Sequence, residues 1–147
     1  MKEAIIEANK AFDMGEVPIG AIIVLQEEIV ARGHNLKEQI KDATAHAEMV
    51  VIKQSIEKLG HWRHLQKATL YVTIEPCPMC AGAIIQSRIR TVVYGAADPK
   101  AGAAGSKVDL LKNPALFNHA IEIVSGVMEK ECANLMQNFF RKLRHRS

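Results

Sequence analysis

Apolar residues recur along this chain with two different periods, and together they predict alternating helices and strands. Residues 2–14 carry Ile5, Ala8 and Phe12 at helical spacing, and Gly15 follows as a stop. The same spacing returns at residues 45–59, 77–88 and 128–143. Apolar, β-branched runs predict strands at residues 19–25, 29–32, 69–74, 91–94 and 121–124. Strands that alternate with helices predict a layered α/β domain.

Turn residues refine these boundaries. Gln26-Glu27-Glu28 separates the first two strands and predicts a hairpin. Gly60 predicts the end of the helix at residues 45–59, and Thr44 or Asp42 is the predicted cap of its start. Residues 96–106 are rich in glycine and alanine and predict a loop. Without repeats or linkers, the 147 residues predict one domain, 1–147.

Composition adds the expected compartment. No apolar run approaches the roughly 20 residues that span a membrane. The first residues are amphipathic and acidic, unlike a secretion signal. With that start and only three cysteines, we expect a reducing, cytoplasmic location and no disulfide framework. Cys132 lies in a helical pattern and is predicted to be a small buried apolar side chain.

The net charge of +3 is unevenly distributed. Residues 1–60 hold seven Lys or Arg against ten Asp or Glu, whereas residues 61–147 hold twelve against six. The last seven residues contain Arg141, Lys142, Arg144 and Arg146. Such a basic end can attract phosphates, but on this feature alone the favoured explanation is cations at a helix C-terminus followed by a solvated end.

Four side chains carry the chemistry that the sequence predicts. His46, Cys77 and Cys80 are three potential zinc ligands, and Glu48 is a carboxylate that does not need to bind metal. Catalytic zinc takes three protein ligands and leaves a fourth position to water, whose pKa falls from about 16 towards about 7. A nearby carboxylate can then carry the proton of that water to a leaving group.

Each half of this pattern alone is weakly specific. Cys-x-x-Cys also occurs in redox pairs and structural zinc sites, and the alternative without a function is a reduced, buried pair of cysteines. A glutamate in the first turn can merely complement the helix dipole. The order His46-x-Glu48 followed by Pro76-Cys77-x-x-Cys80 is much more specific, because it is known as the pattern of zinc nucleobase deaminases.

The chain resembles the bacterial tRNA-specific adenosine deaminases of the cytidine deaminase-like superfamily. The resemblance runs through nearly the whole chain in family order. It is carried by Gly15-Glu16-Val17-Pro18-Ile19-Gly20-Ala21, His34-Asn35, Thr44-Ala45-His46-Ala47-Glu48, Leu70-Tyr71-Val72-Thr73-Ile74-Glu75-Pro76-Cys77, Ser87-Arg88-Ile89, Tyr94-Gly95-Ala96, Asp98-Pro99-Lys100, Gly105-Ser106, Phe117-Asn118-His119 and Phe139-Phe140. The zinc motif fits any deaminase of the superfamily, whereas the later stretches resemble the tRNA branch in particular.

The resemblance implies a three-layer α/β/α fold with a five-stranded mixed sheet and helices on both faces. It implies one Zn²⁺ per chain and hydrolytic conversion of adenosine to inosine at the wobble position of a tRNA anticodon, usually of an arginine tRNA. It also implies a homodimer in which one subunit helps to shape the RNA site of the other.

The resemblance also implies roles for residues around the metal. Asn35 would contact the base, although a turn asparagine is the common alternative. The backbone of Ala47 or Cys77 would hold the water or the base. Asp98 would accept a hydrogen bond from a ribose 2′-hydroxyl, the group that distinguishes RNA from DNA, unless it is only a turn residue before Pro99.

The remaining implied contacts lie at the rim of the site. Lys100 and Ser106 would reach phosphates, and Glu16, Val17 and Pro18 would line the pocket wall. Phe139, Phe140 and Arg141 would dock the RNA or cover the pocket, although core packing of the last helix is an equal alternative for the two aromatic residues.

Two other functions remain open on the sequence. A small-molecule deaminase of cytosine, cytidine or guanine would share the zinc site but would not need Asp98-Pro99-Lys100 or the basic end. A zinc-stabilised RNA-binding subunit without activity is a third interpretation. Glu48 argues against it, because a structural zinc site has four protein ligands and no need of a proton carrier.

Overall fold

A mixed β-sheet forms the centre of the computed structural model, which describes residues 1–116 and 119–146. The strand order is β2-β1-β3-β4-β5. β1 runs antiparallel to both β2 and β3, whereas β3, β4 and β5 are parallel. The bounds are β1 Gly20–Leu25, β2 Glu28–His34, β3 Thr69–Ile74, β4 Thr91–Ala96 and β5 Glu122–Val124.

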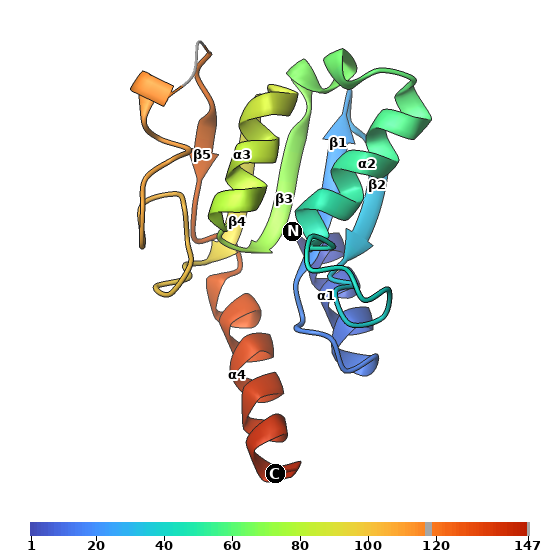
Figure 1. The fold of residues 1–147 in the computed structure, drawn as a ribbon, viewed down its shortest axis with the longest axis vertical. Coiled ribbons are helices and arrows are strands. Elements are labelled where there is room, and N and C mark those ends of the chain that lie inside the picture. Colours follow the sequence, from blue (N-terminus) through green and yellow to red (C-terminus); the bar gives the residue numbers. More distant parts are fainter. Residues whose placement is uncertain (117–118, 147) are drawn as a thin grey trace.

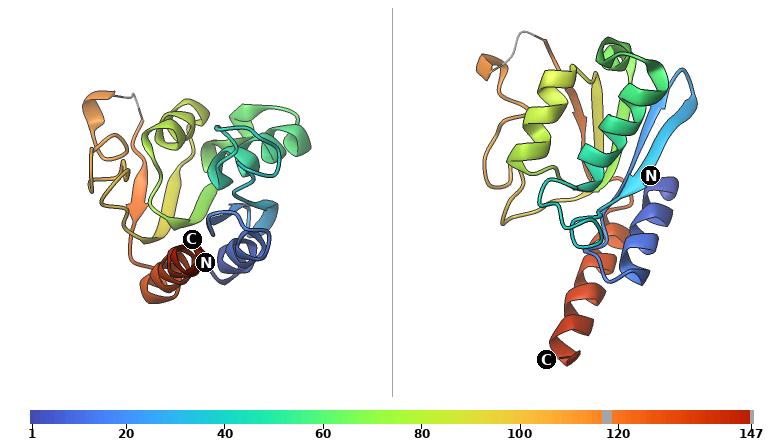
Figure 2. Two further views of the ribbon diagram at one scale, coloured as in Figure 1. Left: turned by 60° about the horizontal axis from the view of Figure 1, so that its bottom comes forward. Right: turned by 45° about the vertical axis from the view of Figure 1, so that its right-hand side comes forward.

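Helices cover both faces of this sheet. α1 (Lys2–Asp13) and α4 (Glu129–Arg146) lie together on one face, and α2 (Ala47–Leu59) and α3 (Pro78–Ser87) lie on the other (Figures 1 and 2). The three layers confirm the predicted α/β/α fold class. Two short 3-10 helices, η1 (Trp62–Lys67) and η2 (Pro114–Leu116), were not expected from the periodicity. α4 continues well past the edge of the sheet (Figure 1).

Two groups of buried side chains hold the layers together. The larger group packs the sheet against α2 and α3 and includes Ile23, Leu70 and Ile84, all fully buried. Each such side chain stabilises the fold by about 1.5–3 kcal/mol relative to an exposed one. The smaller group lies between α4 and the sheet and contains Ile74 and Ala96 of the strands and Cys132 of α4. Cys132 is 1% exposed, which confirms its prediction as a packing residue.

The start of α2 differs from its prediction. Gly60 ends the helix as expected, at a φ of 84° that favours glycine. Neither Thr44 nor Asp42 caps the other end, because α2 begins at Ala47 and His46 holds the N-cap position. Asp42 Oδ1 instead accepts hydrogen bonds from the amide and hydroxyl of Thr44, 2.8 and 2.7 Å away, in a turn before the helix. That turn leaves His46 with an extended backbone at the helix entrance.

The parallel pairing of β3 and β4 decides which loops meet. Ile74 pairs with Ala96 at the last rung of the two strands. The residues that follow, Glu75-Pro76-Cys77 after β3 and Ala97-Asp98 after β4, therefore leave the sheet side by side at the same edge. The starts of α2 and α3 lie at this edge too (Figure 1).

Two further sequence expectations concern features outside this edge. The resemblance at Phe117-Asn118-His119 falls largely on residues 117 and 118, which lie outside the described residues. Within residues 1–116 and 119–146, none of the helices combines the length and the apolar content needed to cross a bilayer.

Candidate active site

The three predicted metal ligands converge from two helix entrances. His46 stands at the N-cap position of α2 and Cys77 at that of α3, with Cys80 one turn further on. Nδ1 of His46 lies 3.5 Å from Sγ of Cys77 and 3.6 Å from Sγ of Cys80. Zinc bonds of about 2.3 Å to sulfur and 2.0–2.1 Å to nitrogen, at tetrahedral angles, require a sulfur–nitrogen separation of about 3.5 Å. The donor set and its spacing therefore fit a zinc ion.

Electrostatics at the same place favour a cation. Hydrogen bonds from Cys80 and His46 lower the pKa of the Cys77 thiol to about 4, and the hydrogen bond to Cys77 in turn raises the pKa of His46. The hydrogen bond to Cys77 and burial raise the pKa of the Cys80 thiol. One thiolate thus opposes ionisation of the other, and a metal ion between them would remove that conflict by deprotonating both. Both helix N-termini add positive potential.

Glu48 lies inside this cluster without being one of its ligands. It occupies the first turn of α2, is 4% exposed, and its carboxylate has the Cys80 thiol as a hydrogen-bonding neighbour. Burial raises the pKa of Glu48 to about 7. A buried carboxylate whose pKa lies near neutrality can both accept and release a proton under working conditions, as a general acid and base must.

Asn35 borders the loop at residues 35–46, which leads into His46. Its Nδ2 donates to the carbonyl of Val17 over 3.3 Å, and its Oδ1 accepts from the amide of Lys37 over 3.2 Å. The bond with Lys37 is that of a turn residue, whereas the bond to Val17 ties Asn35 to the segment after α1. The two bonds use one amide hydrogen and one carbonyl lone pair of the side chain. One amide hydrogen and one lone pair therefore remain with which Asn35 can contact a base. Base contact by Asn35 stays a prediction.

The predicted pocket wall at Glu16, Val17 and Pro18 has a supporting geometry. Glu16 is 1% exposed, and its carboxylate accepts hydrogen bonds from the amides of Glu38 and Gln39 over 3.1 and 2.6 Å. Pro18 is fully buried, whereas Val17 is half-buried. Glu16 therefore holds the loop at residues 35–46 in place. Direct substrate contact by these three residues stays a prediction.

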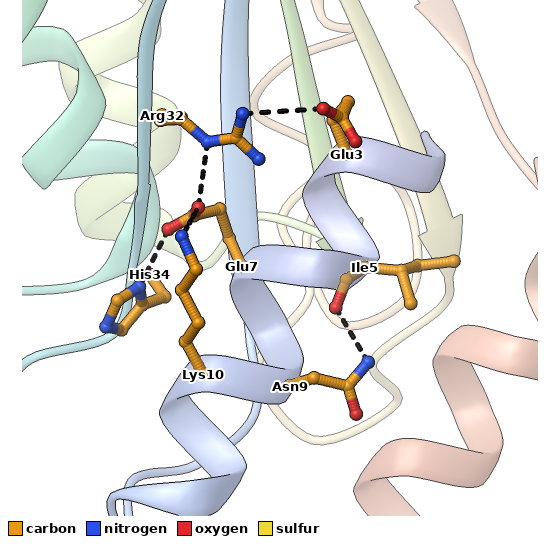
Figure 3. A network of polar contacts seen from close by, with 7 residues as sticks. All are labelled: Glu3, Ile5, Glu7, Asn9, Lys10, Arg32 and His34. Atoms are coloured by element: carbon orange, nitrogen blue, oxygen red, sulfur yellow. Dashed lines mark hydrogen bonds and ion pairs between the residues drawn. The ribbon is translucent and has the colours of Figure 1, made fainter.

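A second buried carboxylate fixes the strand end that precedes Asn35 (Figure 3). Oxygen atoms of Glu7 in α1 accept hydrogen bonds from Nζ of Lys10 at 2.7 Å, Nε of Arg32 at 2.9 Å and Nδ1 of His34 at 2.9 Å. Burial alone would raise the pKa of Glu7, but the bonds from Lys10, His34 and Arg32 lower it to about 2. The ionised carboxylate thus ties α1 to the end of β2, directly before Asn35.

The other predicted contacts lie along a groove of about 510 Å³ between α4 and the loop after β4. Asp98, Lys100, Phe140 and Arg141 all line it. The structure therefore brings Arg141 close to Asp98 and Lys100, although a long stretch of sequence separates them. Ile74 at the end of β3 also lines the groove, whereas His46, Glu48, Cys77 and Cys80 are not among its lining residues.

Phe139 and Phe140, predicted as a pair, separate into two roles. Phe139 is buried against Phe12 of α1, with ring centroids 5.9 Å apart. Phe140 is 39% exposed and faces the groove. Core packing is therefore the role of Phe139, and Phe140 remains available to contact a ligand.

The loop that carries Asp98 is itself highly ordered by hydrogen bonds. Oδ1 of Asp98 accepts from the amides of Lys100 and Ala101 over 3.0 and 3.3 Å, which is a local turn. The Ser106 hydroxyl donates to the carboxylate of Glu75. The amide of Ser106 donates to the same carboxylate at 3.2 Å. Both donors of Ser106 are therefore already used, so its predicted phosphate contact would need a rearrangement, and it stays a prediction.

Glu75 is the residue whose role sequence reasoning missed. It lies just after β3, is 3% exposed, and accepts hydrogen bonds from Asp98, Ala104 and Ser106. Burial alone would raise the pKa of Glu75, but those bonds hold it below its usual value. A glutamate directly after an apolar buried strand was the available signal, because such a carboxylate must find donors when it is buried.

Comparison with known proteins places the whole chain among deaminases. A family model described as MafB19-like deaminase matches residues 1–144. The tRNA-specific adenosine deaminase of Bacillus subtilis (strain 168) is 56% identical over 98% of this chain and 88% of its own length. The chloroplastic tRNA(adenine(34)) deaminase of Arabidopsis thaliana is 46% identical over 96% of this chain, which corresponds to 12% of that longer protein.

Solved structures show the same likeness in three dimensions. A structure from a study of A-to-I editing by tRNA:A34 deaminases superposes with a TM-score of 0.87, at 47% identity over 92% of this chain and 96% of that one. A guanine deaminase from Bacillus subtilis superposes with a TM-score of 0.62, at 39% identity over 65% of this chain and 61% of that one.

Proposed function

Since this chain belongs to the tRNA-specific adenosine deaminase family and matches the MafB19-like deaminase family model, we propose that it hydrolyses adenosine to inosine at the wobble position of a tRNA anticodon. The observation that carries the proposal is the cluster of His46, Cys77 and Cys80 with Glu48 buried against it. A proton carrier beside an open three-ligand metal site belongs to hydrolytic chemistry rather than to a structural metal.

The residues of the cluster would divide the reaction between binding and proton transfer. His46, Cys77 and Cys80 would hold one zinc ion, which supplies a nucleophilic water at neutral pH when it is bound. Glu48 would take one proton of that water as its oxygen adds to C6 of adenine and would pass this proton to the ring nitrogen. It would then move the remaining hydroxyl proton to the amino group, which leaves as ammonia while the C6 carbonyl forms. The target base must leave its stack, which costs less in an anticodon loop than in a duplex.

Three features of the setting belong to the same proposal. The groove of Asp98, Lys100 and Arg141 would receive the nucleotides beside the target. The tRNA would be an arginine tRNA, and the enzyme would work in the cytoplasm as a homodimer. Hydrogen bonds order both loops beside the candidate metal ligands, at residues 35–46 and 97–106. This order supports a site that is preorganised before the RNA binds.

Incubation with a synthetic tRNA anticodon stem-loop and, separately, with free adenosine, cytidine and guanine tests the function. We expect inosine in the stem-loop only at the wobble position and little turnover of the free compounds. Preferred turnover of guanine would support the small-molecule alternative, which the 39% identical guanine deaminase structure makes the relevant rival. Sequencing of cellular tRNA for inosine, with and without the protein, extends the test to the natural substrate.

We expect Asp98→Asn to lower activity on RNA while narrowing the difference between RNA and DNA. The anionic carboxylate accepts from a ribose 2′-hydroxyl, and DNA leaves it unpaired, at a cost of roughly 1–3 kcal/mol or more. Asparagine keeps Oδ1 for the turn with Lys100 and Ala101 but removes the charge. The measurement is the ratio of kcat/KM on matched RNA and single-stranded DNA stem-loops. An unchanged ratio would mean that Asp98 serves only the turn.

We also expect the basic end of α4 to contribute to the salt dependence of tRNA binding. Replacing Arg141, Lys142, Arg144 and Arg146 with glutamine should flatten the log–log plot by up to about 0.7–0.9 for each phosphate that is no longer neutralised. The control removes the same charge at the other edge of the sheet, through glutamines at the exposed Lys58, Arg63, Lys67 and Arg90. Equal slopes in the two variants would show that only net charge matters.

A further inference from the structure

Glu75 joins the two loops that leave the sheet beside each other. Its Oε1 accepts from the amide of Asp98 at 3.1 Å and from the hydroxyl of Ser106. Its Oε2 accepts from the amides of Ala104 at 2.8 Å and Ser106 at 3.2 Å. Four donors thus converge on one buried carboxylate, and every one of them comes from the substrate loop, which we define as residues 97–106.

The surroundings of Glu75 leave no room for another arrangement. A Cβ on Gly102 would lie 2.4–2.5 Å from the carboxylate atoms of Glu75, so any other residue there would push the carboxylate away from its donors. The backbone on either side of the carboxylate is bonded as well. The amide of Glu75 donates to the carbonyl of Ala96 at 2.9 Å, and the amide of Ala103 donates to the carbonyl of Pro76 at 2.7 Å. The substrate loop is therefore tied to the segment that ends in Cys77.

We propose that Glu75 is a positioning residue that clamps the substrate loop against the Cys77 segment and thereby sets the distance between the reacting base and Asp98. This inference rests on the proposed function, because it gives the loop a substrate to position. The clamp makes one rigid unit of a metal ligand and a sugar contact. A flipped nucleotide whose base lies at the metal then meets a ribose contact at a fixed place.

A second carboxylate clamp, at the loop before His46, provides an internal comparison. The carboxylate of Glu16 accepts hydrogen bonds from two amides, those of Glu38 and Gln39, in the loop before His46. The carboxylate of Glu75 does the same for three amides of the substrate loop. Each carboxylate serves its own loop. Loss of one clamp should therefore loosen one loop and leave the other ordered.

Amide hydrogen exchange tests the clamp without reference to activity. In Glu75→Gln, an NH₂ group replaces an oxygen that accepts two hydrogen bonds, so two donors lose their partner. We expect exchange at Asp98, Ala104 and Ser106 to accelerate by about tenfold or more, because local opening becomes easier, while exchange at Glu38 and Gln39 stays unchanged. Glu16→Gln should give the reciprocal pattern. Unchanged exchange in the substrate loop of Glu75→Gln would overturn the clamp.

Kinetics on matched stem-loops test the positioning role. We expect Glu75→Gln to keep its zinc, to lose about tenfold in kcat/KM on RNA, and to narrow the RNA-to-DNA ratio as Asp98→Asn does. Combining Glu75→Gln with Asp98→Asn should narrow the RNA-to-DNA ratio of kcat/KM no further than either change alone, because the two residues act as one unit. Glu57→Gln, at an exposed glutamate of α2, is the neutral control. Additive effects, or a ratio that stays at the wild-type value, would overturn the inference.

Ser106 offers a milder version of the same test if Glu75→Gln does not fold. Ser106→Ala removes one of the four donors and should shift exchange and the RNA-to-DNA ratio in the same direction by a smaller factor, whereas Ser106→Thr keeps the hydroxyl and should restore both. Equal behaviour of the two Ser106 variants would count against the clamp. A wild-type protein inactive on the stem-loop would overturn the proposed function, and the exchange data would still decide the clamp itself.

Discussion

Glu48→Ala is expected to reduce turnover of a tRNA stem-loop by about a hundred- to ten-thousand-fold, the usual contribution of a general acid and base. The physical reason is that Glu48 lies buried beside Cys80 without being a metal ligand, and burial holds its pKa at about 7. Its replacement removes the group that moves protons and leaves His46, Cys77 and Cys80 in place. Single-turnover kinetics on the stem-loop, with zinc content measured on the same sample, provide the comparison.

Glu48→Gln separates proton transfer from packing. Glutamine fills the same volume at the start of α2 but cannot accept and release a proton near neutral pH. Both variants should therefore be almost inactive, while the thermal unfolding of Glu48→Gln should stay close to that of the wild type. A glutamine variant that retained wild-type turnover would mean that another group carries the proton.

Loss of a metal ligand is expected to have the second large effect. Wild-type protein purified without added metal should contain one zinc per chain by elemental analysis. His46→Ala and Cys80→Ala should each contain far less, because only two ligands remain, and turnover should fall by more than the roughly 10- to 100-fold that loss of an outer-shell partner costs. The sulfur–nitrogen separations of 3.5 and 3.6 Å are the geometric basis of this expectation.

Cys132→Ala is the matched control for the ligand variants. Cys132 is as buried as Cys80 but lies on the sheet-facing side of α4 against Ile74 and Ala96, and burial raises the pKa of its thiol to about 11. Its removal should cost some stability and leave zinc content and turnover near wild type. An active wild-type preparation that contained no zinc would contradict the proposed mechanism altogether.

Comparing the Glu48 variants with the metal-ligand variants distinguishes loss of proton transfer from loss of zinc binding. Glu48 and the three ligands occupy one small volume between the entrances of α2 and α3. Zinc retained without turnover identifies a proton carrier, and turnover lost together with zinc identifies a ligand. A structural metal site would show the second behaviour at the ligands and no effect at Glu48.

Much of the fold and of the reacting centre followed from local pattern. The two apolar periods located every strand and α-helix of the described residues, since burial on a sheet or under a helix imposes its spacing on the sequence directly. His46, Glu48, Cys77 and Cys80 could be named because metal ligands and a proton carrier are rare residue types in a specific order. Cys132 followed from the same periodicity.

Predictions were weakest where polar groups chose between partners. Asp42 and Thr44 are residue types that favour helix N-caps, yet they hydrogen-bond to each other in a turn before α2. His46 occupies the N-cap position instead, and its side chain makes no capping hydrogen bond. The hairpin turn was placed correctly, but nothing local indicated that Gln26 and Glu27 would both adopt a positive φ. The 3-10 helix η1 lies in a segment without a strong period.

By itself, the sequence indicated the alternation of helices and strands, the candidate metal ligands and the candidate proton carrier, because these depend on residue type and spacing along the chain. The three-layer arrangement was implied by the resemblance to the deaminase family. Only the tertiary structure decided which loops these groups share. The parallel register of Ile74 with Ala96 places Glu75 against residues 98–106, and the packing of Phe139 on α1 brings Arg141 to the same groove as Asp98. Contacts between segments far apart in sequence arise from strand register and helix packing, which no local pattern encodes.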